Sequence, residues 1–391
     1  METAEKKHTR LGDFMVRFRK PLVWLARIVI GAIFLISGLS KLIDPWGFIY
    51  KMDQYLAVWG FTFPRTITLV GSIAIAGTEF VTGAMMLFGN YRRASMWILT
   101  GAMVVMLPLT FYIMVKNPVS DCGCFGDFWI ISNEATFYKN VFISVVLIYL
   151  WRNNLKIGGL FHPASQWLVG VLLWAYSIIV GFIGYNFQPM IDFRSHPVGT
   201  QYSVGKSDAQ KDEVDEELDD MEFIYKRNDE YRTFNADNLP DESDGWVFVE
   251  RQSKNETKAL KKIHLDEVMT VYNEDDVDVT DDVFHGSGDQ VVLLIPDLRR
   301  VDISYTFLIN EMYKRAKEKD VDFFAIIATD KKGLEGWRDI SMAKYPCYTA
   351  DDTDIKELAR GNIAVLLIEN GRITGKRNIS SLDEALAGTE I

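Results

Sequence analysis

The sequence predicts an α-helical membrane bundle followed by a soluble α/β domain. Long apolar stretches fill residues 1–190, whereas short strand and helix patterns alternate after residue 287. The charge changes sign along the chain as well. Residues 1–190 hold 16 Lys and Arg against 9 Asp and Glu, which leaves a net charge of −18 for residues 191–391. These observations divide the chain into a basic membrane half and an acidic soluble half.

Membrane spans are predicted from the length of the apolar stretches, because a helix needs roughly 20 such residues to cross a bilayer. The weakest candidate, 136–151, contains Lys139, whose charged end can reach the headgroup region. The first four candidates form the predicted membrane domain at 21–155, and the last is a fifth span at 164–186. The candidate spans are 22–42, 66–88, 94–115, 136–151 and 165–185.

Basic residues predict the orientation, since they concentrate on the cytoplasmic side of a membrane. They lie in the tail at 1–20, after the second span at Arg92 and Arg93, and after the fourth span at Arg152 and Lys156. The tail is therefore expected to be cytoplasmic. Five crossings then place the loop after the third span, and everything after the fifth span, outside the cytoplasm. Four crossings would leave the soluble half in the cytoplasm.

Two ionisable residues, Arg27 and Glu79, fall inside the first and second predicted spans. An isolated charge in the bilayer is costly, so we expect Glu79 to face the bundle interior. It would be neutralised there by Arg27 or by protonation. The structural alternative is a polar contact that holds helices together without any chemistry.

Smaller signals predict how the first helices pack. Small residues in the first two spans allow two helix backbones to approach closely. These residues are Gly31, Gly38, Gly71, Gly77 and Gly83. The aromatic-rich run at 46–61 follows the first span and predicts a short helix at the membrane interface.

The sharpest chemical feature is the pair Cys122 and Cys124, in the run NPVSDCGCFGDFW after the third span. A disulfide across one glycine closes a very small, strained ring, and strain makes a disulfide easier to reduce. So short a loop also removes little entropy from the unfolded chain, which weakens any stabilising purpose. Redox exchange is therefore predicted, with a static disulfide and a pair of free thiols as alternatives.

No metal site is predicted at this pair. Zinc needs four ligands, and no histidine lies near the two cysteines in the sequence. Copper(I) held by two thiolates stays open as an alternative.

Residues 21–155 resemble the DoxX and MauE family of membrane proteins. The resemblance rests on RIVIGAIFLISGLSKLIDP, on GTEFVTGAMMLFG and on DCGCFGD. It implies a four-helix membrane bundle and, for MauE, an accessory part in disulfide formation or in the maturation of a periplasmic enzyme. The added fifth span and soluble half are similar to DoxX-family proteins of Bacteroidetes-type bacteria. They imply a bacterial inner membrane and a periplasmic C-terminal domain.

The soluble half begins with an acidic linker at 187–222, a composition that stays solvated and extended. A small β-rich element is predicted at 223–286, with a hairpin in FIYKRNDEYRTF and a further strand in GWVFVER. The order of strands and helices over 287–391, which ends in a hairpin with an Asn370–Gly371 turn, resembles the thioredoxin-like fold.

The segment that resembles thioredoxin lacks both hallmarks of thioredoxin chemistry. LRRVD stands where the family has its Cys-x-x-Cys, and Ile363 and Ala364 stand where it has a proline. The third cysteine, Cys347 in YPCY, is interpreted as a small core residue. The alternative is a thiol that resolves the loop pair.

Two functions compete on this evidence. The first is a redox protein that passes electrons between the Cys122 and Cys124 pair and a quinone or protein partner. The second is a non-catalytic scaffold whose degenerate thioredoxin-like domain binds another envelope protein. A transporter is disfavoured because no inverted repeat is evident. No phosphate-binding loop, dinucleotide fingerprint or hydrolase motif occurs, and the acidic soluble half argues against nucleic acid. The expected partners are lipid and an envelope protein.

Overall fold

A computed structural model describes most of the chain, and two compact units can be distinguished in it. One unit comprises Met1–Pro197 with two short C-terminal segments, Ala359–Ala364 and Arg377–Asp383, and the other comprises most of the remainder. Much of the predicted acidic linker lies outside the described residues. The described residues are 5–119, 121–194, 196–201, 221–227, 230–235, 247–253, 269–284 and 287–382.

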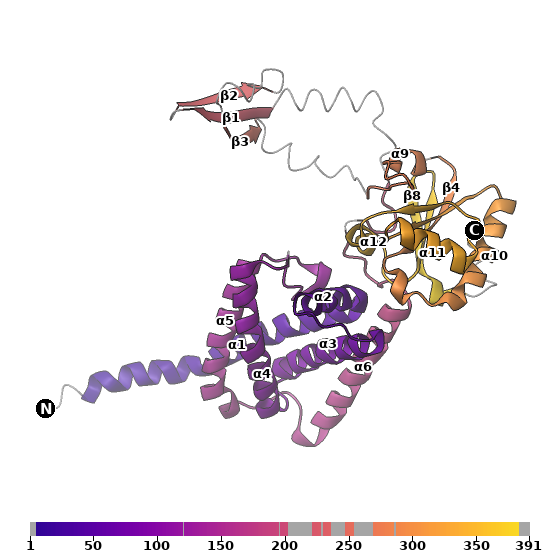
Figure 1. The fold of residues 1–391 in the computed structure, drawn as a ribbon. Helices are drawn as coiled ribbons and strands as arrows, with labels where there is room; N and C mark the ends of the chain where they lie inside the picture. The colour runs from indigo at the N-terminus through magenta and orange to yellow at the C-terminus, as the bar shows by residue number, and fades with distance from the viewer. Residues whose placement is uncertain are drawn as a thin grey trace. The chain divides into compact units, whose positions relative to one another are not determined.

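The first unit is helical (Figure 1). Each predicted membrane segment forms a helix, and the aromatic-rich run forms a further one, α2. Short 3-10 turns lie at Gly126–Phe128, Asn154–Lys156 and Pro163–Ser165. The α-helices are α1 (Glu5–Ile43), α2 (Pro45–Val58), α3 (Arg65–Phe88), α4 (Arg92–Lys116), α5 (Asn133–Asn153) and α6 (Gln166–Asn186).

Local sequence explains where these helices begin and end. The side chain of Asp44 accepts a hydrogen bond from the Gly47 amide at 2.9 Å, and Pro45 occupies the first helical position of α2. This cap and proline separate α2 from α1. Helix α3 ends at Gly89, whose φ of +68° is readily adopted only by glycine. The chain turns there into α4.

Three of the five glycines predicted to permit close packing, Gly31, Gly38 and Gly83, lie where α1 meets α3. A Cβ on Gly38 would lie 2.3 Å from the Phe80 nitrogen, and a Cβ on Gly83 would lie 2.4 Å from the Leu35 nitrogen. Any larger side chain would therefore force these two helices apart. The prediction of close backbone approach is confirmed at these glycines, whereas Gly71 and Gly77 face side chains of α2 and α6.

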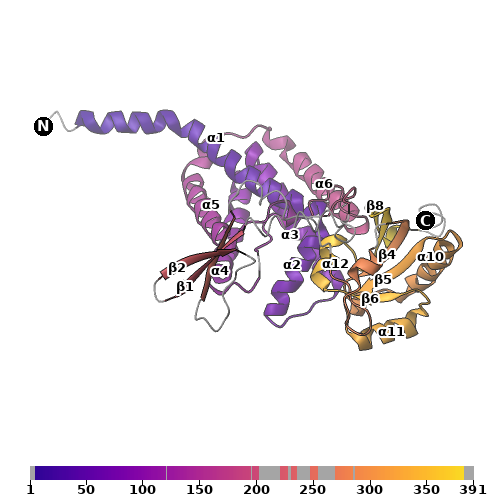
Figure 2. The same ribbon diagram turned by 90° about the horizontal axis from the view of Figure 1, so that it is seen from above.

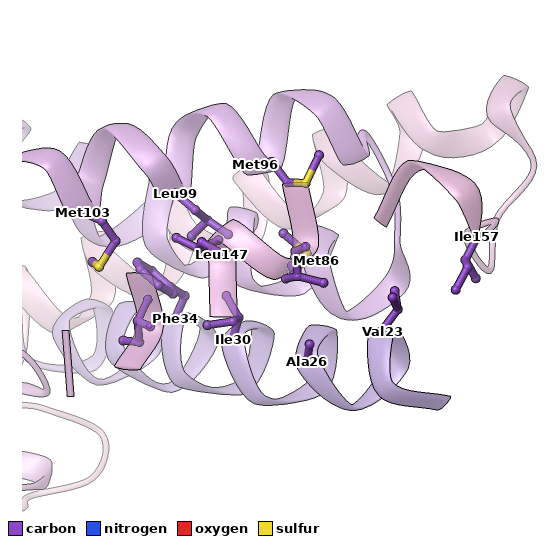
Figure 3. Packing of buried hydrophobic residues seen from close by; sticks show 12 residues of the cluster. Val23, Ala26, Ile30, Phe34, Met86, Met96, Leu99, Met103, Leu147 and Ile157 are labelled. Carbon is purple, nitrogen blue, oxygen red and sulfur yellow. The ribbon is translucent and has the colours of Figure 1, made fainter. Parts of the chain in front are cut away.

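The bundle core is apolar and draws on five helices. Figure 3 shows one cluster, in which side chains of α1 meet Met86 of α3, three residues of α4 and Leu147 of α5. A second cluster joins α1 and α3 to α6 through Leu42, Phe80 and Val180. The first cluster includes Val23, Ala26, Ile30, Phe34, Met96, Leu99, Met103 and Ile157.

Four helices of the described chain are long and apolar enough to cross a membrane: Phe18–Ile43, Arg65–Phe88, Arg92–Lys116 and Pro163–Asn186. Helix α5, predicted as a span at 136–151, does not reach that apolarity although it has 21 residues. Polar side chains account for this difference. Lys139, Asn140 and Arg152 lie on α5.

Helix α5 nevertheless runs the full length of α4, antiparallel to it. At one end, the Asn133 side chain donates to Asn117 Oδ1 at 2.7 Å, just beyond the last residue of α4. At the other end, Trp151 Nε1 donates to Thr100 Oγ1 at 2.9 Å, and Arg92 donates to the carbonyl groups that follow α5. Both helices therefore extend from one end of the bundle to the other.

The second unit contains a mixed α/β sheet of five strands (Figure 2). The strand order is β6-β5-β4-β7-β8, and β4 pairs in parallel with β5, as β5 does with β6. All residues of β4 and β5 except the first are buried, which explains their almost continuous apolar sequences. The strands are β4 (Asp289–Ile295), β5 (Asp322–Ile327), β6 (Cys347–Thr349), β7 (Ala364–Glu369) and β8 (Arg372–Asn378).

The helices of this unit follow the predicted alternation with strands. Asn370 and Gly371 join β7 to β8 with φ values of +48° and +73°, as the predicted Asn-Gly turn requires. The helices are α9 (Thr280–Val283), α10 (Thr306–Glu318), α11 (Lys331–Ser341) and α12 (Asp352–Leu358), and 3-10 turns lie at Leu298–Arg300, Ile303–Tyr305 and Ile379–Ser381.

A separate sheet of three strands contains β1 (Met221–Arg227), β2 (Glu230–Asn235) and β3 (Val247–Ser253). Its order is β2-β1-β3, and β1 is antiparallel to both neighbours. The predicted hairpin and the predicted third strand are thus both confirmed.

Candidate functional site

The candidate site is the segment 117–132 between α4 and α5, which we call the cysteine loop. Within it, the sulfur atoms of Cys122 and Cys124 lie 3.0 Å apart, close enough for a thiol hydrogen bond. A disulfide has a sulfur separation of about 2.05 Å, so a small movement would join them. Gly123, between the cysteines, has a φ of +66°. The backbone thus already turns both thiols toward each other.

Helix α2 holds the cysteine loop in this conformation. Lys51 Nζ lies 2.5 Å from Asp121 Oδ2, and the other carboxylate oxygen of Asp121 accepts from the Gly123 amide at 2.8 Å. Tyr55 donates its hydroxyl to the Cys122 carbonyl at 3.0 Å. These contacts fix the backbone on both sides of Gly123. Cys122 is buried behind α2, whereas Cys124 is only half-buried.

A buried polar network lies against the same loop. Lys41 Nζ of α1 lies 2.7 Å from Glu79 Oε2 of α3, and Ser37 Oγ lies 2.8 Å from the same oxygen. The Ser37 hydroxyl also lies 2.6 Å from the Cys124 carbonyl oxygen. Lys41 is 4 % exposed, so this ion pair is screened from solvent. Glu79 is thereby connected to the cysteine loop through one serine.

The predicted neutralisation of Glu79 by Arg27 is wrong, because the partner is Lys41. Arg27 lies at the opposite end of the bundle, where it donates to the carbonyl groups of Asn154 at 2.9 Å, Ile157 at 2.8 Å and Gly158 at 3.0 Å. The physical reason is position along the helices. Antiparallel α1 and α3 bring the end of α1 beside the middle of α3, and Arg27 is four turns earlier.

The surroundings of the two thiols shift their pKa values in opposite directions. The hydrogen bond from Cys122 lowers the pKa of the Cys124 thiol to about 6, with further help from the charges of Lys139 and Lys41, against burial and Glu79. The same hydrogen bond, together with burial, raises the pKa of Cys122. Lys139 Nζ lies 4.7 Å from the Phe125 ring centre, at the edge of the loop. Cys124 is therefore the thiolate of the pair.

Replacing Gly123 by alanine tests the loop geometry. A Cβ at this residue would lie 3.1 Å from Lys51 Cγ and would demand the left-handed conformation of a residue that disfavours it. We expect Gly123→Ala to lower the free energy of unfolding by about 1–2 kcal/mol and to slow disulfide formation. The matched control is Gly101→Ala in α4, where the added Cβ meets no atom within 4 Å. Equal stability of the two variants in a denaturant titration would contradict the account.

Replacing Arg27 by methionine tests the role assigned to the opposite end of the bundle. The variant would remove the donor to the Gly158 carbonyl and to the side-chain oxygen of Asn154, while Arg92 still donates to the carbonyl groups of Asn154 and Ile157. We therefore expect a loss of about 1–3 kcal/mol in unfolding free energy. Thiol reactivity of the cysteine loop should not change. Arg93→Met, at an exposed residue of α4, is the control. A change in Cys124 reactivity in Arg27→Met would mean that the two ends are coupled.

The third cysteine lies in the second unit and is part of its core. Cys347 opens β6 and is 3 % exposed. Burial raises the pKa of its thiol to about 11, against the favourable effect of Arg338. These are properties of a packing residue, and they disfavour a role in resolving the loop pair.

The segment after β4 carries charged residues and no cysteine. Asp297 caps the short turn Leu298–Arg300 and pairs with Arg299 at 3.0 Å and with Arg300 at 3.4 Å. Among the described residues, no group of three or more His, Cys, Asp or Glu is placed to hold a metal ion.

Sequence reasoning missed the residues that surround the cysteines: Ser37, Lys41, Lys51, Tyr55 and Asp121. One signal was available, because Ser37 and Lys41 are four residues apart and so share one face of a helix. Lys41 lies at the end of the first predicted span, 22–42, where a charged residue by itself predicts no partner. Lys51 and Tyr55 also share a face of α2, but nothing in the sequence directs that face to the loop.

Comparison with known families gives two matches. Residues 19–152 match the family of methylamine utilisation protein MauE, and residues 220–258 match a domain of unknown function, DUF8463. No curated protein and no solved structure matches the chain. The first match begins in α1 and ends in α5, so it contains the cysteine loop and the Lys41–Glu79 pair. With four apolar helices and this match, the chain is a multi-pass membrane protein with a MauE-like helical region.

Proposed function

We propose that Cys122 and Cys124 form a dithiol–disulfide pair that exchanges disulfides with an envelope protein outside the cytoplasm. The observation that supports this proposal most strongly is the 3.0 Å separation of the two sulfur atoms in a loop that α2 holds in place. The partner is a protein with two thiols. These thiols supply the two electrons that reduce the loop disulfide, so the exchange needs no separate oxidant. The name of the matched family, a methylamine utilisation protein, suggests that this exchange serves the maturation of an enzyme.

The proposed exchange begins with the disulfide form. A partner thiolate attacks the sulfur of Cys124, the more exposed of the pair, and Cys122 leaves and takes up a proton. The second partner thiolate then attacks the partner sulfur of the mixed disulfide, and Cys124 leaves as a thiolate. The partner becomes a disulfide and the loop a dithiol. A thiolate with a pKa of about 6 is a good leaving group, and its stability favours the reduced loop, as in strong disulfide oxidants.

The proposed location follows from the ends of the bundle. Arg92, Arg93 and Arg152 lie at the end opposite to the cysteine loop, and such residues concentrate in the cytoplasm. Helix α5 runs the length of α4, which supports a crossing despite its modest apolarity. Five crossings place the cysteine loop and the end of α6 on the same, non-cytoplasmic face. We propose a bacterial inner membrane as the site of action.

A second function, a membrane-anchored scaffold, is supported by one observation. The segment after β4 carries Asp297, Arg299 and Arg300 instead of cysteines, so the α/β domain offers a surface and no thiols there. We retain a thioredoxin-like fold for this domain as a proposal, on its strand order alone. In this second function the domain binds an envelope protein and the loop cysteines are structural.

Equilibration in glutathione buffers distinguishes these functions. In the redox function, mass spectrometry of purified protein finds a reversible Cys122–Cys124 disulfide, and Cys122→Ser retains glutathione on Cys124. The matched variant Cys124→Ser retains far less, because the remaining thiol is buried and weakly acidic. A pair that stays in one state across all ratios of glutathione to its disulfide would refute the redox function and favour the scaffold.

A further inference from the structure

The cysteine loop has a second ionic contact, which comes from the C-terminal segment Ala359–Ala364 of the first unit. Arg360 Nε donates to Asp44 Oδ2 at 2.8 Å, and Arg360 Nη2 donates to Asp127 Oδ2. Asp127 belongs to the cysteine loop, and the Arg360 side chain is 4 % exposed. One buried guanidinium group therefore joins the loop to Asp44, the residue that caps α2.

The surroundings of Arg360 hold its backbone and its guanidinium group in place. Gln188 donates to the Arg360 carbonyl at 2.6 Å and accepts from the Arg360 amide at 3.1 Å. The Tyr50 ring centre lies 5.6 Å from Arg360 Cζ, and the Tyr50 hydroxyl donates to the Gly361 carbonyl at 3.0 Å. A Cβ on Gly47 would lie 3.0 Å from Arg360 Nη2, so the glycine leaves room for the guanidinium group. Arg360 is therefore a rigid point to which the loop is attached.

Arg360 fixes the end of the turn that contains Cys124. The Gly126 amide donates to the Gly123 carbonyl at 3.1 Å, and this hydrogen bond closes the turn. Asp127 follows the turn directly, so its bond to Arg360 holds the end of the turn, while the contacts from α2 hold its start. A turn that is held at both ends keeps the sulfur of Cys124 close to the sulfur of the other cysteine.

We infer that Arg360 is a positioning residue for closure of the loop disulfide, the step that returns the loop to its oxidised form. The inference rests on the proposed function. The Cys124 thiolate first attacks a small disulfide such as oxidised glutathione, which leaves one glutathione on Cys124 and releases the other as a thiolate. Cys122 then loses its proton to solvent and attacks the Cys124 sulfur. The Cys122–Cys124 bond forms, the bond from Cys124 to glutathione breaks, and the second glutathione leaves as a thiolate. The two glutathione molecules gain the two electrons that the loop loses.

Closure depends on the separation of the sulfur atoms because it is an intramolecular reaction. Reacting atoms need to be held about 3–3.5 Å apart and in line for such a step to be fast. The two sulfur atoms of the loop lie 3.0 Å apart. Without Arg360 the end of the turn would lose its ionic contact, and Asp44 and Asp127 would lose the cation that they share. The sulfur atoms would then meet less often.

The test follows closure in the full-length protein, which is reduced and then mixed with oxidised glutathione. Acid quenching and mass spectrometry give the fraction of protein that carries glutathione on Cys124 over time. Closure is recognised by a rate that does not depend on the glutathione concentration. We expect closure to be roughly tenfold slower in Arg360→Met, so that glutathione accumulates on Cys124. Arg315→Met, which breaks a partly exposed pair with Glu311 on α10, should close at the wild-type rate.

A triple variant separates positioning from stability. Arg360→Met alone leaves two carboxylates without their shared cation, which by itself lowers stability. Adding Asp44→Asn and Asp127→Asn removes both charges, and asparagine still caps a helix. We expect the triple variant to be more stable than Arg360→Met in a denaturant titration and yet to close as slowly. It also replaces Arg360→Met in the test where that variant folds poorly.

The outcomes distinguish the positioning role from the exchange function. Closure at the wild-type rate in Arg360→Met, or in the triple variant, would overturn the positioning role of Arg360 while leaving the exchange function intact. A wild-type protein that never forms the Cys122–Cys124 disulfide from oxidised glutathione would instead overturn both.

Discussion

At pH 7 the Cys124 thiol is expected to react with iodoacetamide largely as a thiolate, with a reaction midpoint near pH 6. A thiol whose pKa is about 6 is roughly 90 % ionised at neutral pH, whereas an ordinary cysteine is ionised to a few per cent. The cause is the hydrogen bond from Cys122, supported by Lys139 and Lys41. The measurement is the rate of alkylation at each cysteine against pH in the reduced protein, resolved by mass spectrometry.

The sign of the pH dependence is fixed by the direction of the pKa shift. A lowered thiol pKa leaves the sulfur reactive as the pH falls from 8 toward 6, where an ordinary thiol has already become inert. Cys347 is an internal control, because burial and a pKa of about 11 should keep it unreactive until the protein unfolds. Cys122→Ala removes the donated hydrogen bond and should move the midpoint upward. A midpoint near the ordinary cysteine value in the wild type would contradict the assignment of Cys124.

Replacing Lys41 by methionine is expected to cost about 3–5 kcal/mol of unfolding free energy, because a buried charge loses its partner. Lys41 and Glu79 are 2.7 Å apart, with side-chain exposures of 4 % and 18 %. The variant leaves the Glu79 carboxylate among apolar helices without its counter-charge. The measurement is a denaturant titration of the purified protein.

Two further variants separate the ion pair from generic effects of the substitution. Lys41→Met combined with Glu79→Met removes both charges and should recover most of the lost stability. Lys356→Met breaks the pair of Lys356 with Asp352 on α12, whose side chains are 25 % and 51 % exposed, and should cost less than about 0.5 kcal/mol. A Lys41→Met variant as stable as Lys356→Met would show that the buried pair contributes little.

The sequence predicts most of the architecture because apolar length and strand alternation depend on local composition. Helices at all five predicted spans, the predicted short helix after the first span, the β1–β2 hairpin and the Asn370–Gly371 turn appear in the described chain. The prediction of close packing at Gly38 and Gly83 holds because small residues have one effect whatever their partners are. Only the apolarity of α5 is lower than a span requires, owing to its polar residues.

The polar partners could not be predicted, because they depend on how antiparallel helices are shifted along their axes. Arg27 and Glu79 lie on neighbouring helices, yet a shift of a few turns decides whether Arg27 or Lys41 meets the carboxylate. The acidity of Cys124 has this origin only in part. Its largest cause is the hydrogen bond from Cys122, two residues away, and the further effects of Lys41, Glu79 and Lys139 come from three helices up to about 100 residues apart in the sequence.

The central claim is that the loop cysteines alternate between dithiol and disulfide outside the cytoplasm. The most direct test labels intact cells with a membrane-impermeant maleimide, before and after a membrane-impermeant phosphine reductant. The account predicts that Cys124 becomes labelled after reduction, that the label is lost in Cys124→Ser, and that reoxidation restores protection. Labelling that occurs only after the cells are opened, or that is the same before and after reduction, would contradict it.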